Sequence, residues 1–167
     1  MTTREDLIDG LRTVLREGKR VTSQFGPDDW QRPALGDEGG WDRKQVYCHL
    51  TALAEITPGM VGGLANAAPG QDTAAGLDIN ALNAQMVAAK AQMSEKELMN
   101  AFDASFTKLI DFVKTIPEEQ LTRTTKFGDL EGQVADILDG VLVLHSIAHI
   151  YGAGGAPALA GGVPPAG

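Results

Sequence analysis

The sequence predicts an all-α protein that folds as an up-down four-helix bundle, with long loops and a C-terminal tail rich in Gly, Ala and Pro. Four long segments carry apolar residues at the three- and four-residue spacing of an amphipathic helix, and capping signatures precede three of them. Almost no segment alternates apolar and polar residues as a half-buried strand does. In such a bundle, sites are built in the interior from side chains on facing helices.

The first helix is predicted to open at Thr3, because Asp6 stands three residues later in a capping-box pattern. Its apolar stripe comprises Leu7, Leu11, Val14, Leu15 and Val21. The Gly-Pro pair at 26–27 ends it. A loop rich in Gly, Pro and Asp follows, with Trp30 and Trp41 near its two ends.

The second helix is expected to start near Asp42, with Gln45 as its capping partner. Its inward stripe is predicted to hold Val46, His49, Leu50, Leu53, Ile56 and Met60. Pro58 removes an intrahelical hydrogen bond, so we expect a kink or break near Thr57. Residues 67–76 form a second loop.

A third helix is predicted over residues 78–93, and Ser94 with Glu97 forms a further capping signature. It opens a segment reaching about Thr115 that carries Leu98, Phe102, Phe106, Leu109 and either Phe112 or Val113. The pattern leaves open whether residues 78–115 form two helices or one bent helix.

The C-terminal third contains the last predicted helix, over residues 132–151. A short turn at 117–121 and an irregular connection at 122–131 precede it. Its inward stripe is expected to hold Val134, Ile137, Leu138, Val141, Leu142, His145 and His149. We therefore predict one helical domain over residues 1–152, and a mobile tail over 153–167 that has no periodic pattern.

Composition places the chain among ordinary globular proteins, with 167 residues, 43% hydrophobic and 22% charged. The net charge of −8 argues against a nucleic-acid partner, which would need clustered Lys and Arg. The single cysteine, Cys48, excludes an intrachain disulfide and favours a reducing compartment. With neither a signal-peptide pattern nor a long apolar run, the prediction is a cytoplasmic protein without a membrane partner.

All three histidines fall on predicted inward stripes. His145 and His149 are four residues apart, so their Cβ atoms lie about 5–6 Å apart on one helix face and both imidazoles could reach one metal ion. The alternative is a pair of core histidines, although burying two imidazoles requires a partner for each. His49 lies on the second helix, and only the fold can bring it to the pair.

The order of motifs resembles a known family. The matching pieces are Gly40 to Leu50 (GWDRKQVYCHL), Leu77 to Asn83 (LDINALN), Ser94 to Leu98 (SEKEL), Ile116 to Leu121 (IPEEQL) and His145 to His149 (HSIAH). Over residues 3–152 the chain resembles the DinB/YfiT-like superfamily of bacterial metal-binding four-helix bundles. Within it, the chain is similar to the N-terminal domain of mycothiol-dependent maleylpyruvate isomerases.

This resemblance implies that His49, His145 and His149 hold a divalent metal ion, with zinc or nickel expected. Two features differ from the isomerases: they have a carboxylate where this chain has His145, and they carry a further catalytic C-terminal domain. The resemblance therefore implies transfer to or from a low-molecular-weight thiol, such as mycothiol or bacillithiol, in detoxification or stress response, rather than isomerisation.

Three neutral imidazoles would leave the charge of the metal uncompensated, which lowers the pKa of a bound water or thiol. Hydrolysis and thiol transfer of a small-molecule substrate are both open, as is a non-catalytic structural or sensory metal-binding module. No carboxylate shares a stripe with the histidines. Glu55 and Asp139 are offset by roughly 120° around their helices, and we interpret them as surface or outer groups.

Several neighbouring residues have two interpretations. Asn80 and Asn83 could present amides to the site or substrate, or serve helix capping and solvent. Trp41 packs the long loop or lines the pocket. Cys48 is interpreted as a buried small hydrophobe rather than a fourth ligand, and Tyr151 as a cap of the last helix.

A homodimer is a further expectation. It would form through exposed helix faces or through the apolar tail, where Leu159 and Val163 have no obvious use within one chain.

Overall fold

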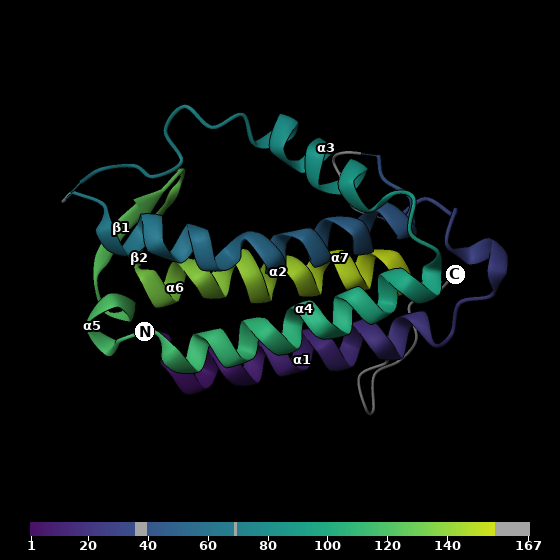
Figure 1. The fold of residues 1–167 in the computed structure, drawn as a ribbon, viewed down its shortest axis with the longest axis horizontal. Helices are drawn as coiled ribbons and strands as arrows, with labels where there is room; N and C mark the ends of the chain where they lie inside the picture. The colour runs from purple at the N-terminus through teal and green to yellow at the C-terminus, as the bar shows by residue number, and fades with distance from the viewer. Residues whose placement is uncertain (36–39, 69, 156–167) are drawn as a thin grey trace, which may run out of the picture.

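The computed structural model describes residues 1–35, 40–68 and 70–155, and it confirms an all-α four-helix bundle (Figure 1). Three of its long helices are α1 (Arg4–Thr22), α2 (Arg43–Asn66) and α4 (Glu95–Thr115). The fourth is a composite of α6 (Val134–Leu138), the π-helical segment η2 (Asp139–Leu144) and α7 (His145–Gly154). A single-turn 3-10 helix, η1 (Pro27–Asp29), follows α1.

The helix directions differ from simple up-down alternation. Arg4, at the start of α1, donates to the carbonyl of Ile116 after α4, so α1 and α4 are antiparallel. Lys44 at the start of α2 bonds to Ala91 just before α4, and Glu55 in the middle of α2 bonds to Ser105 in the middle of α4, so these two helices are parallel. The reason is α3 (Ile79–Lys90), which runs back along α2 as a crossover and returns the chain to the end where α2 began (Figure 1).

The predicted helix starts are confirmed. Thr3 with Asp6, Asp42 with Gln45, and Ser94 with Glu97 all form complete capping boxes. Because Ser94 caps its own helix, α3 and α4 are two helices and not one bent helix. Each box satisfies backbone N–H groups that have no partner within the helix, which fixes where the helix begins.

Of the kink or break predicted near Thr57, the break is wrong, because α2 continues through Pro58 to Asn66. Proline removes one intrahelical bond, and the buried side chains of Val61 and Leu64 beyond it keep the second half of the helix packed. The buried face of α2 also differs from the predicted inward stripe, because Thr57 is buried whereas Ile56 is 40% exposed.

The connection between α4 and α6 is more regular than predicted. The expected turn is the short helix α5 (Glu118–Leu121). The expected irregular segment is an antiparallel hairpin of β1 (Thr124–Phe127) and β2 (Leu130–Gln133), with Thr124 opposite Gln133 and Phe127 opposite Leu130. Gly128 makes its turn possible with a φ of +59°, and its N–H donates to Asp72.

The last helix changes its buried face at η2. Val134, Ile137 and Leu138 face the core before it, whereas Ser146 and Ile150 do so after it. The π-helical segment accommodates one extra residue, which turns the following helix by roughly 100°. His145 and His149 therefore lie half-buried beside the core stripe and not on it, which corrects the predicted face.

The last helix is longer than predicted, because α7 continues past residue 151 to Gly154, and Gly155 follows with a φ of +79°. The mobile tail predicted for 153–167 lies, from residue 156 on, outside the described residues.

Within the described residues, one helix, Val134–Gly154, is long and apolar enough to span a membrane. An 18-residue apolar window of this helix is 44% buried inside the bundle, and the helix packs against α1 and α2. A core helix passes the same test of length and composition.

Close packing between α1 and α4 gives a first testable prediction. A methyl group at Gly18 would lie 2.6 Å from Cζ of the fully buried Phe102. We expect Gly18→Ala to lower the free energy of unfolding by about 1–3 kcal/mol, because overpacking forces the aromatic ring to move. The matched control is Gly63→Ala in α2, where nothing lies within 4 Å and the alanine should add up to about 1 kcal/mol. Urea denaturation measures both, and an unchanged midpoint for Gly18→Ala would contradict the prediction.

Candidate metal centre

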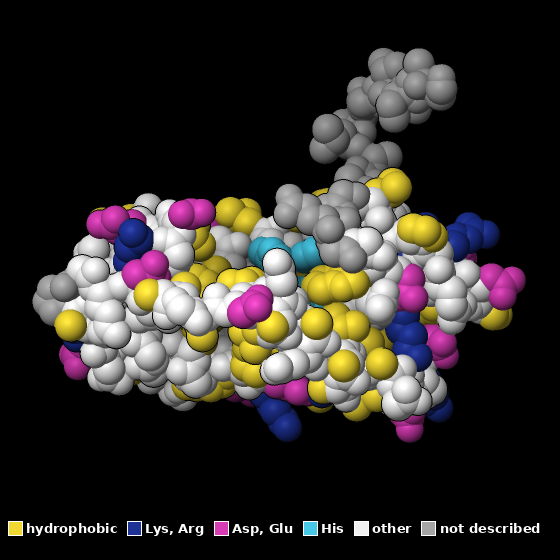
Figure 2. Space-filling view, turned by 90° about the horizontal axis from the view of Figure 1, so that it is seen from above, with side chains coloured by type: hydrophobic (Ala, Val, Ile, Leu, Met, Phe, Trp, Pro, Cys, Tyr) yellow, Lys and Arg dark blue, Asp and Glu magenta, His cyan; other side chains and the backbone are white. Residues whose placement is uncertain are grey.

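The structure brings the three predicted histidines together. His49 extends from α2, and His145 and His149 extend from α7, with one ring nitrogen of each lying within 4.8 Å of the others. The ring centroid of His49 lies 5.3 Å from that of His145 and 5.5 Å from that of His149. Figure 2 shows histidine side chains reaching the surface together, next to apolar side chains, on the face where α3 lies.

Helix direction explains this meeting. Because α2 and α7 are antiparallel, the second turn of α2 lies beside the C-terminal half of the last helix, where the i,i+4 histidine pair sits. His49 is only 2% exposed, whereas the other two are half-buried. The cluster thus has one deep member and two members nearer to solvent.

The protonation state of His49 suits a metal ligand. Nε2 of His49 lies 3.0 Å from Nε2 of His145, so one of the two donates a hydrogen bond to the other. Burial, together with the charge of the neighbouring His145 and His149, lowers the pKa of His49 to about 3. The neutral imidazole keeps a free lone pair, which is the form that binds metal.

The donor set fits a divalent ion such as zinc or nickel. Nitrogen ligands about 2.0–2.1 Å from a tetrahedral zinc lie roughly 3.3–3.4 Å apart. The His49–His145 distance is close to this spacing, and small side-chain rotations would bring the third nitrogen into range. Imidazole is a preferred ligand of both metals.

Trp41 is the other aromatic residue at the cluster. Its ring centroid lies 4.9 Å from that of His49 at an interplanar angle of 43°, and 6.0 Å from that of His149 at 29°. Trp30, at the other end of the long loop, instead lies in the core against Phe25 and Tyr47.

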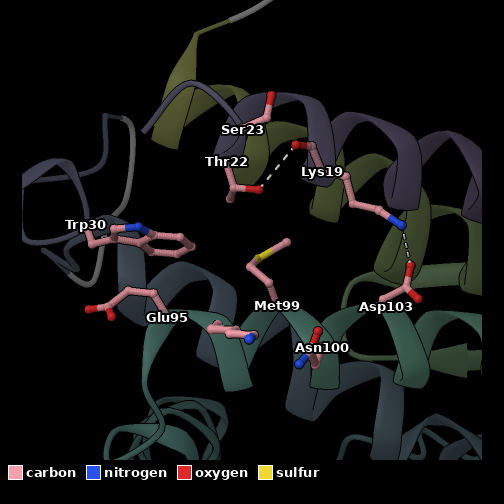
Figure 3. A pocket seen from close by; sticks show the side chains of 9 residues that line it. Lys19, Thr22, Ser23, Trp30, Glu95, Met99, Asn100 and Asp103 are labelled. Carbon is pink, nitrogen blue, oxygen red and sulfur yellow. Dashed lines mark hydrogen bonds and ion pairs between the residues drawn. The ribbon is translucent and has the colours of Figure 1, made fainter. Parts of the chain in front are cut away.

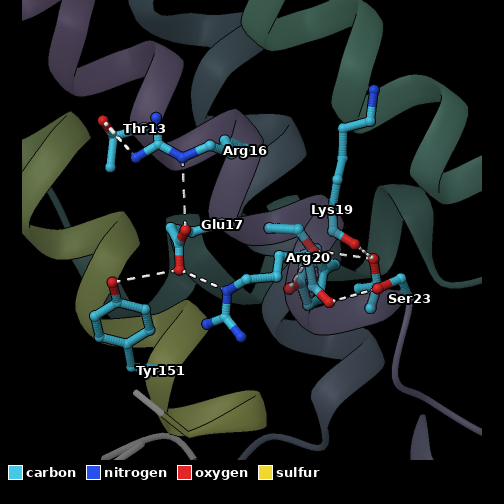
Figure 4. Close-up of polar contacts among 10 residues, drawn as sticks. Thr13, Arg16, Glu17, Lys19, Arg20, Ser23 and Tyr151 are labelled. Atoms are coloured by element: carbon cyan, nitrogen blue, oxygen red, sulfur yellow. Dashed lines mark hydrogen bonds and ion pairs between the residues drawn. The ribbon is translucent and has the colours of Figure 1, made fainter. Parts of the chain in front are cut away.

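The remaining candidates are a cysteine, two asparagines and a tyrosine. Cys48 is fully buried outside the histidine cluster, and burial raises the pKa of its thiol to about 11. Asn80 is exposed and Asn83 half-buried on α3, and neither side chain makes a hydrogen bond within the part of the chain that the structure describes. Tyr151 does not cap the helix with its side chain. Its hydroxyl instead lies 3.5 Å from the carboxylate of Glu17 on α1 (Figure 4).

Glu17 and Glu55 each have partners outside the histidine cluster. Glu17 is buried and pairs with Arg20 at 2.9 Å (Figure 4). Glu55 accepts from Lys90 at 2.7 Å and from Ser105 at 3.1 Å. Asp139 lies in η2, where burial raises its pKa. Among the described residues, the histidine cluster contains no carboxylate that could serve as a general base.

A separate cavity of about 430 Å³ opens between α1 and α4 (Figure 3). Lys19 and Asp103 line it and pair with each other at 2.7 Å, and Trp30 lines its other end. Since the histidines lie on α2 and α7, this cavity belongs to a different part of the bundle.

Comparison with known proteins agrees with the bundle. Residues 11–139 match the family model of the mycothiol maleylpyruvate isomerase N-terminal domain. The match includes His49 and ends before His145. No curated protein sequence matches this chain.

Three solved structures share the fold. Mycothiol-dependent maleylpyruvate isomerase aligns with a TM-score of 0.64 at 13% identity, and a histidine-to-alanine mutant of it with 0.65 at 13%. Each alignment covers 88% of this chain and 60% of the isomerase, so the chain spans well under two thirds of that protein. YfiT from Bacillus subtilis, described as a probable metal-dependent hydrolase with an unusual four-helix bundle topology, aligns with 0.61 at 17%, covering 89% and 82%. The DinB/YfiT-like fold expected from the sequence is confirmed.

Proposed function

This chain belongs to the mycothiol maleylpyruvate isomerase N-terminal domain family, and from that premise we propose that it is a divalent-metal-dependent transferase acting with a low-molecular-weight thiol. His49, His145 and His149 are the proposed ligands, and zinc or nickel the proposed metal. The observation that carries the proposal is the convergence of three histidines from two helices, with nitrogens within 4.8 Å. Mycothiol or bacillithiol is the proposed class of thiol, and an electrophilic small molecule the substrate.

The chemistry of the site favours a thiol over water. A divalent ion held by three neutral imidazoles supplies a Lewis acid that lowers the pKa of a bound thiol or water. The described residues place no carboxylate in the cluster to remove a proton. A thiol, with an ordinary pKa of about 8.5, needs far less help to ionise than water at about 15.7, so thiol transfer suits this residue set better than hydrolysis.

The expected result is metal-dependent thiol consumption. With mycothiol or bacillithiol and a panel of small electrophiles, the protein should form thiol conjugates, and a chelator should reduce the rate to background. Zinc or nickel should restore it. The variant lacking both His145 and His149 is the control, and mass spectrometry of the conjugate is the readout. A wild-type rate that equals this control on every electrophile would contradict the proposal.

A second candidate is a metal-dependent hydrolase, which the description of YfiT supports. Hydrolysis of an ester or amide panel without any thiol, again lost on chelation, would distinguish it from the transferase. Bound metal with no turnover in either assay would instead indicate the structural or sensory module.

We also propose that the protein acts in the cytoplasm, which its single buried cysteine and acidic charge suit. A homodimer remains part of the proposal. Sedimentation equilibrium of the full chain and of a chain ending at Gly155 would test whether residues 156–167 contribute to it.

A further inference from the structure

Hydrogen bonds fix the backbone at Trp41 and at the residue that follows it. Its carbonyl accepts a hydrogen bond from the N–H of Ala34 at 3.0 Å, and the next residue, Asp42, caps α2 and forms a bridge with Pro33. The capping box ties Asp42 to Gln45 through two hydrogen bonds of 2.8 and 2.9 Å. The position of the indole relative to α2 is therefore fixed by the helix start.

The loop segment that pairs with Trp41, residues 33–35, is also tied to α7. The N–H of Leu35 donates to the carbonyl of Gly152 at 2.8 Å, and a methyl group at Gly152 would lie 2.2 Å from the carbonyl oxygen of Leu35. Glycine at 152 thus permits the close approach of the loop. Trp41 is anchored to both helices that carry the histidines.

His49 has an unusual environment for a metal ligand. The ring nitrogen of a metal-binding histidine that does not face the metal commonly donates to a carboxylate or carbonyl, which fixes the ring orientation. Nδ1 of His49 is buried and has no hydrogen-bond partner among the described residues. What lies against this imidazole is the indole of Trp41, at 4.9 Å between centroids.

We propose that Trp41 is a positioning residue of the metal centre. Its indole fixes the rings of His49 and His149 by aromatic contact, tilted against His49 and near-parallel to His149, where a hydrogen bond to Nδ1 of His49 is missing. This inference rests on the proposed metal site. A metal-bound imidazole is electron-poor and the indole face is electron-rich, so the contact is stronger when metal is bound. The aromatic contact therefore contributes to metal affinity as well as to ring orientation.

Three variants distinguish the apolar bulk of the Trp41 side chain from the π-face of its indole. Trp41→Phe keeps an aromatic face, Trp41→Leu keeps apolar bulk without one, and Trp30→Phe changes the core tryptophan as the matched control. Zinc affinity is measured by competition with a chelating indicator. We expect Trp41→Leu to weaken it by roughly ten- to a hundredfold, Trp41→Phe to recover most of the loss, and Trp30→Phe to leave it unchanged.

Two spectroscopic readouts do not depend on activity. In Trp30→Phe, Trp41 is the only tryptophan, so its fluorescence should be quenched by cobalt(II) with saturation at about one equivalent. The visible absorption of the cobalt(II) protein reports ligand geometry and should shift in Trp41→Leu but little in Trp41→Phe. Thermal unfolding of the metal-free variants shows whether each is folded.

The outcomes separate this inference from the proposed function. Unchanged zinc affinity and cobalt spectrum in Trp41→Leu, with a wild type that binds metal through its histidines, would overturn the role of Trp41 and leave the function standing. Equal losses in Trp41→Phe and Trp41→Leu would overturn the role of the aromatic face in favour of packing alone. A wild type that binds neither zinc nor cobalt would overturn both.

Discussion

Replacing both His145 and His149 with alanine should reduce the bound metal from about one equivalent per chain to almost none. Zinc and nickel sites of this kind need three protein ligands, and the double variant leaves only His49. A single buried imidazole cannot hold a divalent ion against water and buffer. Plasma mass spectrometry of protein purified without an affinity tag measures the content and identifies the metal.

Cys48→Ala is the matched control for this experiment. Cys48 is fully buried and adjacent to His49 in sequence, but it lies outside the cluster, so its loss should leave the metal content unchanged. Equal, negligible metal in the wild type and the double variant, persisting after incubation with zinc and nickel, would show that the histidines are core residues. Loss of metal in Cys48→Ala would instead make the thiol a fourth ligand.

The helix starts were predictable because their determinants are local. Thr3, Asp42 and Ser94 each lie three residues before the side chain that completes the capping box, so sequence spacing alone specifies the geometry. The hairpin was not predictable in this way. Its strands have four residues each, and its turn at Gly128 is held by Asp72, which lies 56 residues away.

The turn of the last helix at η2 depends on tertiary packing. The apolar spacing through Val134, Ile137 and Leu138 continues into Leu142 without a visible interruption, so periodicity predicts a regular helix. The structure instead buries Ile150 near Gly18 of α1. Only the facing helix determines which side of α7 is buried, and a single sequence does not contain that information.

The same distinction holds at the metal centre. The i,i+4 spacing places His145 beside His149, and the antiparallel pairing of α2 with α7 is enough to add His49. The contact of Trp41 with two of these rings depends on the path of the loop, through the bonds of Ala34 and Leu35. Loop paths follow from many weak contacts, so the sequence alone leaves two interpretations of Trp41.

The largest expected loss of stability follows Phe102→Ala. Phe102 is fully buried on α4, with its ring 5.4 Å from Tyr47 and 4.7 Å from Phe106, and it lies against Gly18 of α1. Removing it deletes the contact that joins three helices and leaves a cavity, which lowers the free energy of unfolding by about 3–5 kcal/mol. Phe112→Ala, at a half-buried position of the same helix, should cost less. Urea denaturation compares the two, and equal losses would contradict a core centred on Phe102.

Metal binding should survive this loss, because the aromatic cluster joins α1, α2 and α4 whereas the histidines lie where α2 meets α7. Metal bound only to the folded state adds a free energy set by its affinity and concentration, and at a hundred times Kd this is about 2.7 kcal/mol. Chelation should therefore destabilise Phe102→Ala by the same amount as the wild type, and the His145→Ala, His149→Ala protein hardly at all. Denaturation of all three with and without chelator gives this comparison. A chelation effect that shrank in Phe102→Ala would mean that the core and the metal centre are coupled and fold as one unit.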